Sequence, residues 1–201
     1  MPEFRPPLPL RVATPAAWAE AAWADPGSLL SDHAHNEKKA ALTALSLLHA
    51  FTGHPRIPLL LARLAEEELN HFRRVLEALA DIGWSLRPDG GSAYAKALLA
   101  RVGEGGGDGL LDRLLVSALI EARSCERLFL LEREARTRPG LDDPAWLTFL
   151  LELERCEAGH ALTYQSISRD RFGADADRRL DLWLDWEAEV VRGLPHRSVV
   201  H

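Results

Sequence analysis

Apolar residues recur every three or four positions along most of the chain, which is the spacing of one face of an α-helix. No segment alternates between apolar and polar residues as a half-buried strand does. The pattern predicts an all-α protein, with Thr14 as the N-cap of the first helix. The expected helices cover residues 15–24, 28–51, 58–82, 93–102, 109–136, 144–171 and 177–193.

The lengths of the loops predict how the four long helices are connected. Thr52-Gly53 and Pro55 make a short break within the first long pair, and TRPGLDDP makes another within the second pair. A much longer segment, with one short helix in it, joins the pairs. This connectivity predicts a ferritin-like four-helix bundle with one long crossover, plus extra N- and C-terminal helices. Residues 1–201 are expected to form a single domain, with residues 1–14 as a proline-rich arm.

Each predicted long helix has a row of core-facing residues that is apolar at its ends and carries a glutamate near its middle. In two of the rows a histidine follows the glutamate by three residues. The polar residues of the four rows are Glu37, Glu68, His71, Glu121, Glu157 and His160. A buried carboxylate without a partner is costly, and four that face one another are worse unless cations neutralise them. The rows therefore predict a metal site.

The stretch AEEELNH contains three consecutive glutamates, which point in three directions on a helix. Only Glu68 shares a face with His71, and Glu66 and Glu67 turn away from it. Two interpretations of Glu67 remain open: it crosses the bundle to orient His160 in its binding tautomer, or it is an ordinary exposed carboxylate. Cys156 occupies the matching position before Glu157, so His71 is expected to need a different partner.

Four carboxylates and two imidazoles form the ligand set of a di-iron or di-manganese site in a ferritin-like bundle. Oxygen-rich ligands with two imidazoles suit iron or manganese better than copper or thiolate-bound zinc, and the sequence does not choose between them. Cys125 and Tyr164 each lie one turn from a predicted ligand and are candidate pocket residues, although core packing explains both. His33 is expected beside the ligands or in the core.

Composition and charge restrict the class of protein. The chain has two cysteines and no apolar signal core at its start, so we expect a cytoplasmic protein. No apolar run reaches the roughly 20 residues of a membrane span. The formal net charge of −6 excludes a global basic field, so contact with nucleic acid would need a local patch. Basic residues near the ligands or the termini are Lys38, Lys39, Arg73, Arg74, Arg123, Arg127, Arg5, Arg192 and Arg197, and solvated helix faces explain most of them.

Four stretches carry a family resemblance: SLLSDHAHNEKKAALTALSLL, AEEELNHF, ALIEARSCERL and CEAGHALTY. Together they resemble the MiaE-like family of tRNA-modifying di-iron hydroxylases, from about residue 10 to the C-terminus. The resemblance implies a ferritin-like fold, O2 as co-substrate and an external electron-donor protein. It also implies hydroxylation of the isopentenyl group of 2-methylthio-N6-isopentenyladenosine, beside the anticodon in tRNA. The six core-facing residues become the iron ligands.

Two other functions remain open at this point. One is a di-iron oxidase or oxygenase of another small substrate, because a fold does not fix a function. The other is a ferritin-like protein that binds or stores iron. Iron storage would need a self-assembling shell, whereas a hydroxylase is expected to be a monomer or small homo-oligomer. A hydroxylase also needs an apolar pocket beside the metals. The small residues Ala40, Ala44, Ser117 and Ser124 leave room for one.

Overall fold

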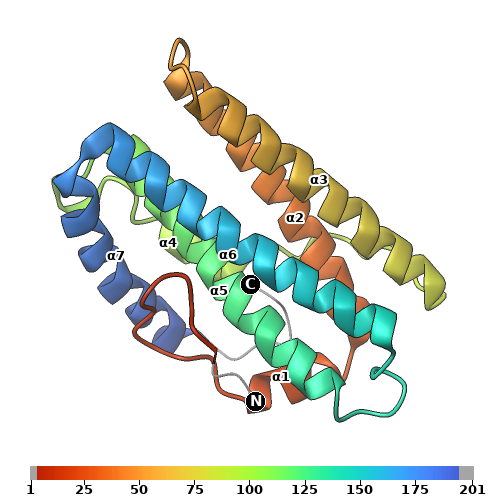
Figure 1. The fold of residues 1–201 in the computed structure, drawn as a ribbon. Coiled ribbons are helices and arrows are strands. Elements are labelled where there is room, and N and C mark those ends of the chain that lie inside the picture. Colours follow the sequence, from red (N-terminus) through yellow and green to blue (C-terminus); the bar gives the residue numbers. More distant parts are fainter. Residues whose placement is uncertain (1–3, 195–201) are drawn as a thin grey trace.

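The computed structural model describes residues 4–194, and within them the chain forms helices and no strand. The α-helices are α1 (Ala17–Ala22), α2 (Pro26–Leu48), α3 (Ile57–Asp81), α4 (Ala93–Leu99), α5 (Gly109–Ala135), α6 (Pro144–Phe172) and α7 (Ala174–Gly193). Two hairpins, α2–α3 and α5–α6, make up the bundle, and the segment that contains α4 crosses from one to the other (Figure 1). The predicted all-α, ferritin-like bundle with one long crossover and extra terminal helices is confirmed.

Side-chain caps explain where most of the long helices begin. Asp25, Asp108 and Asp143 each accept hydrogen bonds from backbone N–H groups of the first turn of α2, α5 and α6. Because Asp25 is the cap, α2 begins two residues before the predicted Ser28, and its predicted last turn is a 3-10 turn, His49–Phe51. The prediction that Thr14 caps α1 is wrong, because its N–H and hydroxyl both donate to the Glu126 carboxylate on α5.

Two apolar clusters fill the interior of the bundle, one towards each end. Leu61, Leu64 and Leu114 belong to one cluster, and Val75 and Leu153 to the other. The predicted glutamates of the four long helices lie between the clusters. Ile82, the last residue of the predicted helix 58–82, is 49% exposed, whereas Leu79 is buried. None of the described helices is long and apolar enough to span a membrane.

Arg123 on α5 is fully buried and joins the N-terminal arm to the C-terminal helix. Its guanidinium forms an ion pair of 2.7 Å with Glu187 on α7 and another with Glu126. It also donates to the carbonyl of Val12 at 2.8 Å. Arg123 is therefore excluded from any local basic patch that could contact nucleic acid. Arg127 is half-buried, with its guanidinium over the ring of Trp18.

Replacing Arg123 with methionine is expected to destabilise the protein by about 3–5 kcal/mol, because Glu187 and Glu126 would stay buried without their cation. Urea denaturation of the metal-free protein measures this change. The matched control is Arg133→Met on the same helix. Because the side chain of Arg133 is exposed, this replacement should lower the free energy of unfolding by less than about 0.5 kcal/mol. Equal losses in the two variants would contradict the role given to Arg123.

Candidate metal centre

The structure brings all six predicted ligands together in the middle of the bundle. Their exposed fractions run from 0% for Glu68 to 5% for Glu121. Their side-chain donor atoms fall into two overlapping groups, each with its atoms within 4.8 Å of one another. The first group is Glu37, Glu68, His71 and Glu157, and the second is Glu68, Glu121, Glu157 and His160. The arrangement has room for two cations that share Glu68 and Glu157, with one imidazole for each.

Unpaired buried atoms test whether the six residues fit a metal. Nδ1 of His160 lies 2.8 Å from Oε1 of Glu68, and Nδ1 of His71 lies 3.4 Å from Oε2 of Glu37. None of these atoms makes a hydrogen bond with good geometry, and neither does Oε2 of Glu68. Buried polar atoms left in this way are rare in folded proteins. Here they converge on shared points, as ligand atoms do around metal ions, so the residues fit a pair of cations.

The electrostatics of the cluster lead to the same conclusion. Burial, and then the charges of Glu157 and Glu68, raises the pKa of Glu121 well above its ordinary value. Burial, followed by the charge of Glu37, also raises the pKa of Glu68. The protein alone thus disfavours having all four carboxylates ionised. Divalent cations at the two positions would reverse this balance, since they stabilise the ionised form of each carboxylate.

Glu67 contacts His160 on the side away from the cluster. Nε2 of His160 lies 2.9 Å from Oε2 of Glu67, which selects the first of the two interpretations of this glutamate. The contact leaves Nδ1 of His160 directed at the cluster. Burial lowers the pKa of His71, but its neighbours Cys156, Glu37 and Glu68 outweigh burial and raise this pKa to about 12. The expectation that His71 needs a partner other than Cys156 stays a prediction.

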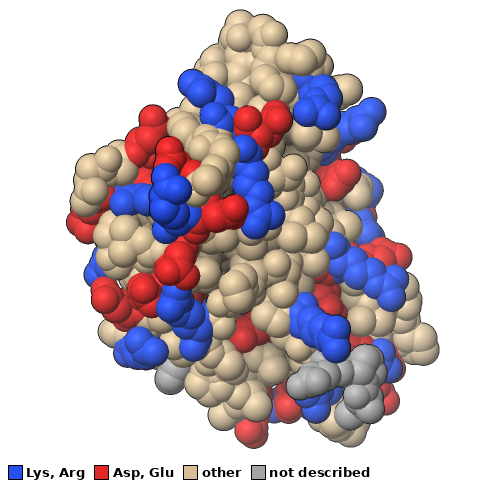
Figure 2. Space-filling view, turned by 60° about the vertical axis from the view of Figure 1, so that its left-hand side comes forward, with Lys and Arg blue, Asp and Glu red and all other residues tan. Residues whose placement is uncertain are grey.

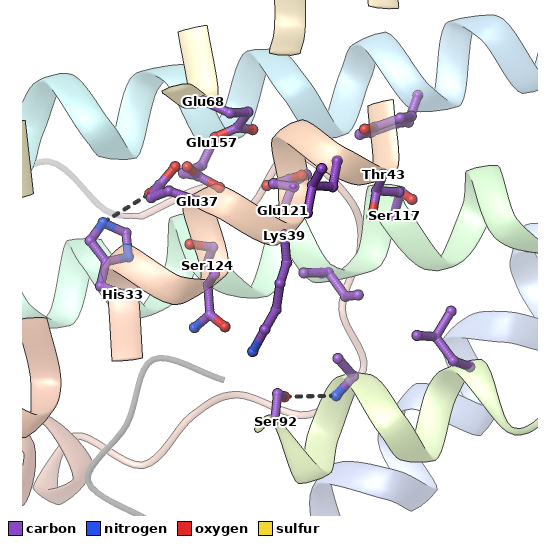
Figure 3. Close-up of a pocket in the computed structure, with 17 residues that line it drawn as sticks. His33, Glu37, Lys39, Thr43, Glu68, Ser92, Ser117, Glu121, Ser124 and Glu157 are labelled. Carbon is purple, nitrogen blue, oxygen red and sulfur yellow. Dashed lines mark hydrogen bonds and ion pairs between the residues drawn. The ribbon is translucent and has the colours of Figure 1, made fainter. Parts of the chain in front are cut away.

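His33 supports the cluster from within α2, one turn before Glu37. Its Nε2 lies 3.0 Å from Oε1 of Glu37, and Figure 3 shows the two side chains facing each other. Burial raises the pKa of Glu37, but the charge of His33, together with the hydrogen bonds of His33 and His71, outweighs burial and lowers this pKa to about 2. His33 is therefore a partner of the cluster, in agreement with its expected place beside the ligands.

A cavity of about 360 Å³ opens beside the cluster. Glu37, Glu68, Glu121 and Glu157 lie at its inner end (Figure 3). Its walls come from α2, α5 and α6, and from α4 through Ser92, Ala95 and Leu99. The sequence did not indicate that the crossover helix would form a wall, because no polar signal marks these three residues. Tyr164, a predicted pocket residue, lines the cavity, and its buried hydroxyl has no hydrogen-bond partner.

The cavity lies on one side of Glu121, and this decides which neighbours line it. Ser117 and Ser124 lie on that side of α5 and form part of the wall, as expected. Cys125 follows Ser124 by one residue, which turns it about 100° around the helix and away from the cavity. It is 2% exposed and is not part of the lining, so its predicted place in the pocket is wrong. Ala40 lines the cavity, whereas Ala44 lies in the apolar core.

Only one of the predicted basic residues lines the cavity, among the part of the chain that the structure describes. Lys39 extends from α2 towards Ser92 (Figure 3). Arg73 pairs with Glu77, which is also on α3. Arg74 on α3 pairs with Glu152 on α6 at 2.7 Å. Arg197 lies outside the described residues. On the face in Figure 2, Lys and Arg side chains are interspersed with Asp and Glu side chains.

Four antiparallel helices around a buried set of glutamates and histidines define the class of ferritin-like proteins with a paired-metal carboxylate site. Comparisons with known proteins give the family. The chain matches the family described as tRNA-(MS[2]IO[6]A)-hydroxylase (MiaE) over residues 8–201. It belongs to this family, as its motifs predicted, and it is an enzyme.

Individual relatives agree with this assignment. The chain is 40% identical to a Pseudomonas putida protein named tRNA 2-(methylsulfanyl)-N(6)-isopentenyladenosine(37) hydroxylase, over 89% of this chain and 84% of that protein. A Salmonella typhimurium protein of the same name is 34% identical, over 64% of this chain and 45% of the relative. A solved structure of a Synechococcus protein with aldehyde deformylating oxygenase activity matches with a TM-score of 0.83. It is 33% identical, and the match covers 96% of this chain and 94% of that one.

Glu68→Ala is expected to lower the metal content from two ions per chain towards none, because Glu68 belongs to both groups of donor atoms. Glu66→Ala is the matched control, since this neighbouring glutamate is exposed and should leave the metal content unchanged. Elemental analysis after loading and desalting makes the comparison. Full loading of the Glu68 variant would remove this residue from the ligand set.

Glu67→Ala is expected to weaken metal binding about 10- to 100-fold without abolishing it, because His160 would lose the contact that fixes its orientation. Competition with a chelator of known affinity measures the change, again with Glu66→Ala for comparison. An unchanged affinity would mean that the contact between Glu67 and His160 does not support metal binding.

Proposed function

We propose that this protein is a non-haem di-iron monooxygenase that hydroxylates the isopentenyl group of 2-methylthio-N6-isopentenyladenosine in tRNA. One observation carries the proposal: in a chain of this family, a cavity with mostly small and apolar walls ends at six buried glutamates and histidines. The substrate is a large polar molecule with one short branched hydrocarbon tail. Such a cavity suits the tail.

Iron is proposed in both positions, held by Glu37 and His71 on one side and by Glu121 and His160 on the other, with Glu68 and Glu157 shared. Manganese suits the same oxygen and nitrogen donors. When bound and reduced, the metal pair supplies the activation of O2. The overall reaction takes O2, two electrons and two protons, and gives the hydroxylated side chain and water. The two electrons would come from an external donor protein.

The chain's own residues have three tasks in this reaction. Glu67 fixes the imidazole of His160, so that its Nδ1 remains available to a metal. His33 keeps Glu37 ionised. Tyr164 offers a hydroxyl without a partner to whatever enters the cavity, and is the one such phenol among the described residues that line it.

The shape of the cavity favours an aliphatic tail over a large ring. Ala40, Ser117 and Ser124 are small and leave space beside the glutamates, while Leu99 and Ile120 supply apolar surface. Burying the tail there removes apolar area from water, at roughly 25 cal/mol per Å². The same burial excludes water from the metals while the tail is in place. A cytoplasmic location and a monomer or small homo-oligomer remain predictions.

A second candidate function is oxygenation of an aliphatic aldehyde. It is favoured by the likeness to the Synechococcus protein with aldehyde deformylating oxygenase activity. An acyl chain and a prenyl tail make similar demands on an apolar cavity. The two candidates differ in their products, since a deformylating reaction gives formate and a shortened hydrocarbon.

The expected outcome of turnover is one oxygen atom from O2 in the nucleoside side chain. The reduced, iron-loaded protein is given prenylated tRNA under isotopically labelled dioxygen, and the nucleosides are then analysed by mass spectrometry. Glu68→Ala should give no labelled nucleoside. Label in water alone, with the nucleoside unchanged, would contradict the proposal, and formate from an added aldehyde would favour the second candidate.

A further inference from the structure

The cavity opens to solvent between α2 and α4, at the end opposite the glutamates. Leu42 on α2 is 60% exposed and Leu99 on α4 is 52% exposed, although both line the cavity. The helix α4 packs against α5 and α7, which leaves its side towards α2 free to form the mouth. Two exposed leucines therefore flank the opening.

Lys39 stands at this mouth and is held by a carboxylate from the crossover segment. Its Nζ lies 2.8 Å from Oδ1 of Asp89, and Nζ of Lys38 lies 4.0 Å from Oδ2 of the same residue. Both lysines and Asp89 are about one-third exposed. Two cations face one anion here, so the trio keeps a net positive charge beside the opening.

The segment that carries Asp89 is fixed to α2 by several hydrogen bonds. The N–H of Arg87 donates to Oγ of Ser31 at 3.1 Å, and Nε2 of His35 donates to the carbonyl of Arg87 at 2.8 Å. Lys38 donates to Nδ1 of His35 at 3.1 Å. The two lysines are therefore already held at the mouth by the protein, and little side-chain entropy remains to be lost when a ligand binds.

The polarity of the site matches the polarity of the proposed substrate. In a prenylated nucleotide the hydrocarbon tail projects from the base, and the phosphates lie at the far end, beyond the ribose. In the protein, the apolar cavity leads inward and the cations stand outside its mouth. A tail that reaches the glutamates would leave the phosphates near the lysines, where phosphate contacts can fix the position of the nucleotide.

We propose that Lys39, assisted by Lys38, binds an RNA phosphate next to the prenylated nucleoside, and that this phosphate takes the place of the Asp89 carboxylate. The inference rests on the proposed function and goes further, because it names the entrance and the residue that positions the RNA. Asp89 then competes with the phosphate until the substrate arrives. An exposed ion pair of this kind costs little to exchange.

The test is a double-mutant cycle between Lys39 and the phosphates of a prenylated anticodon stem-loop. Binding is measured by fluorescence anisotropy with the metal-loaded protein. Lys39→Met should weaken binding about tenfold, the loss of one charge-assisted hydrogen bond. It should also lower the slope of log affinity against log salt by about 0.7–0.9. A neutral methylphosphonate on one side of the prenylated nucleoside should weaken binding to the unaltered protein equally, and have no effect on Lys39→Met.

Two further variants make the cycle specific. Arg73→Met removes a cation that is also paired with a carboxylate but lies away from the cavity, and should leave affinity and salt slope unchanged. Asp89→Asn removes the competing carboxylate and should tighten binding about two- to fivefold. Metal content is measured in every variant and should stay at the level of the unaltered protein.

Three results would overturn the inference. The first is that Lys39→Met binds the stem-loop as tightly as the unaltered protein. The second is that the losses of affinity caused by Lys39→Met and by each methylphosphonate add up fully. The third is that Asp89→Asn binds the stem-loop more weakly. The cycle needs no turnover, so it is independent of the test of the proposed function. Unlabelled nucleoside together with an intact cycle would reject the hydroxylase activity and keep the RNA contact.

Discussion

The structure depends on the cost of placing four carboxylates in the interior of one helical bundle. Glu68 is fully buried, and the other three glutamates are nearly so. No arrangement of the surrounding apolar side chains can repay the desolvation of four charges, and their mutual repulsion adds to it. Bound cations would resolve the conflict. The fold of this chain and its affinity for metal are therefore expected to be coupled, with the metal contributing to the stability of the folded state.

The two faces of the metal centre have different surroundings. On the side of α2 and α5, beside Glu37 and Glu121, the helices carry small residues and leave a cavity that α4 closes in part. On the side of α3 and α6, the imidazole of His160 is held by Glu67. One face is shaped for the substrate and the other for holding the histidines. This division follows from the order of motifs along the chain, because Glu-x-x-His occurs only in the second helix of each hairpin.

The sequence was sufficient for the parts of the protein that follow helical periodicity. The burial of Glu37, Glu68 and Glu121 could be predicted, because a glutamate in the middle of a core-facing row lies on the same helix face as the buried apolar residues on either side of it. The wall formed by α4 could not, since the position of a crossover helix depends on its packing against α5 and α7. Cys125 was a candidate pocket residue because it lies one turn from Glu121. That spacing gives only its distance from a predicted ligand, and it does not tell on which side of α5 the cavity lies. Arg123 looked exposed because two of its partners, Thr14 and Glu187, are distant in sequence.

Those distant partners give the buried guanidinium a consequence for the order in which the chain folds. Arg123 is paired with Thr14, which is 109 residues before it, and with Glu187, which is 64 residues after it. A growing chain that has left the ribosome only as far as α6 already contains all six predicted ligands, yet it still lacks Glu187. The predicted metal site can therefore form before the outer layer of the fold is complete. Docking of α7 onto α5 then closes the fold as a late, long-range step.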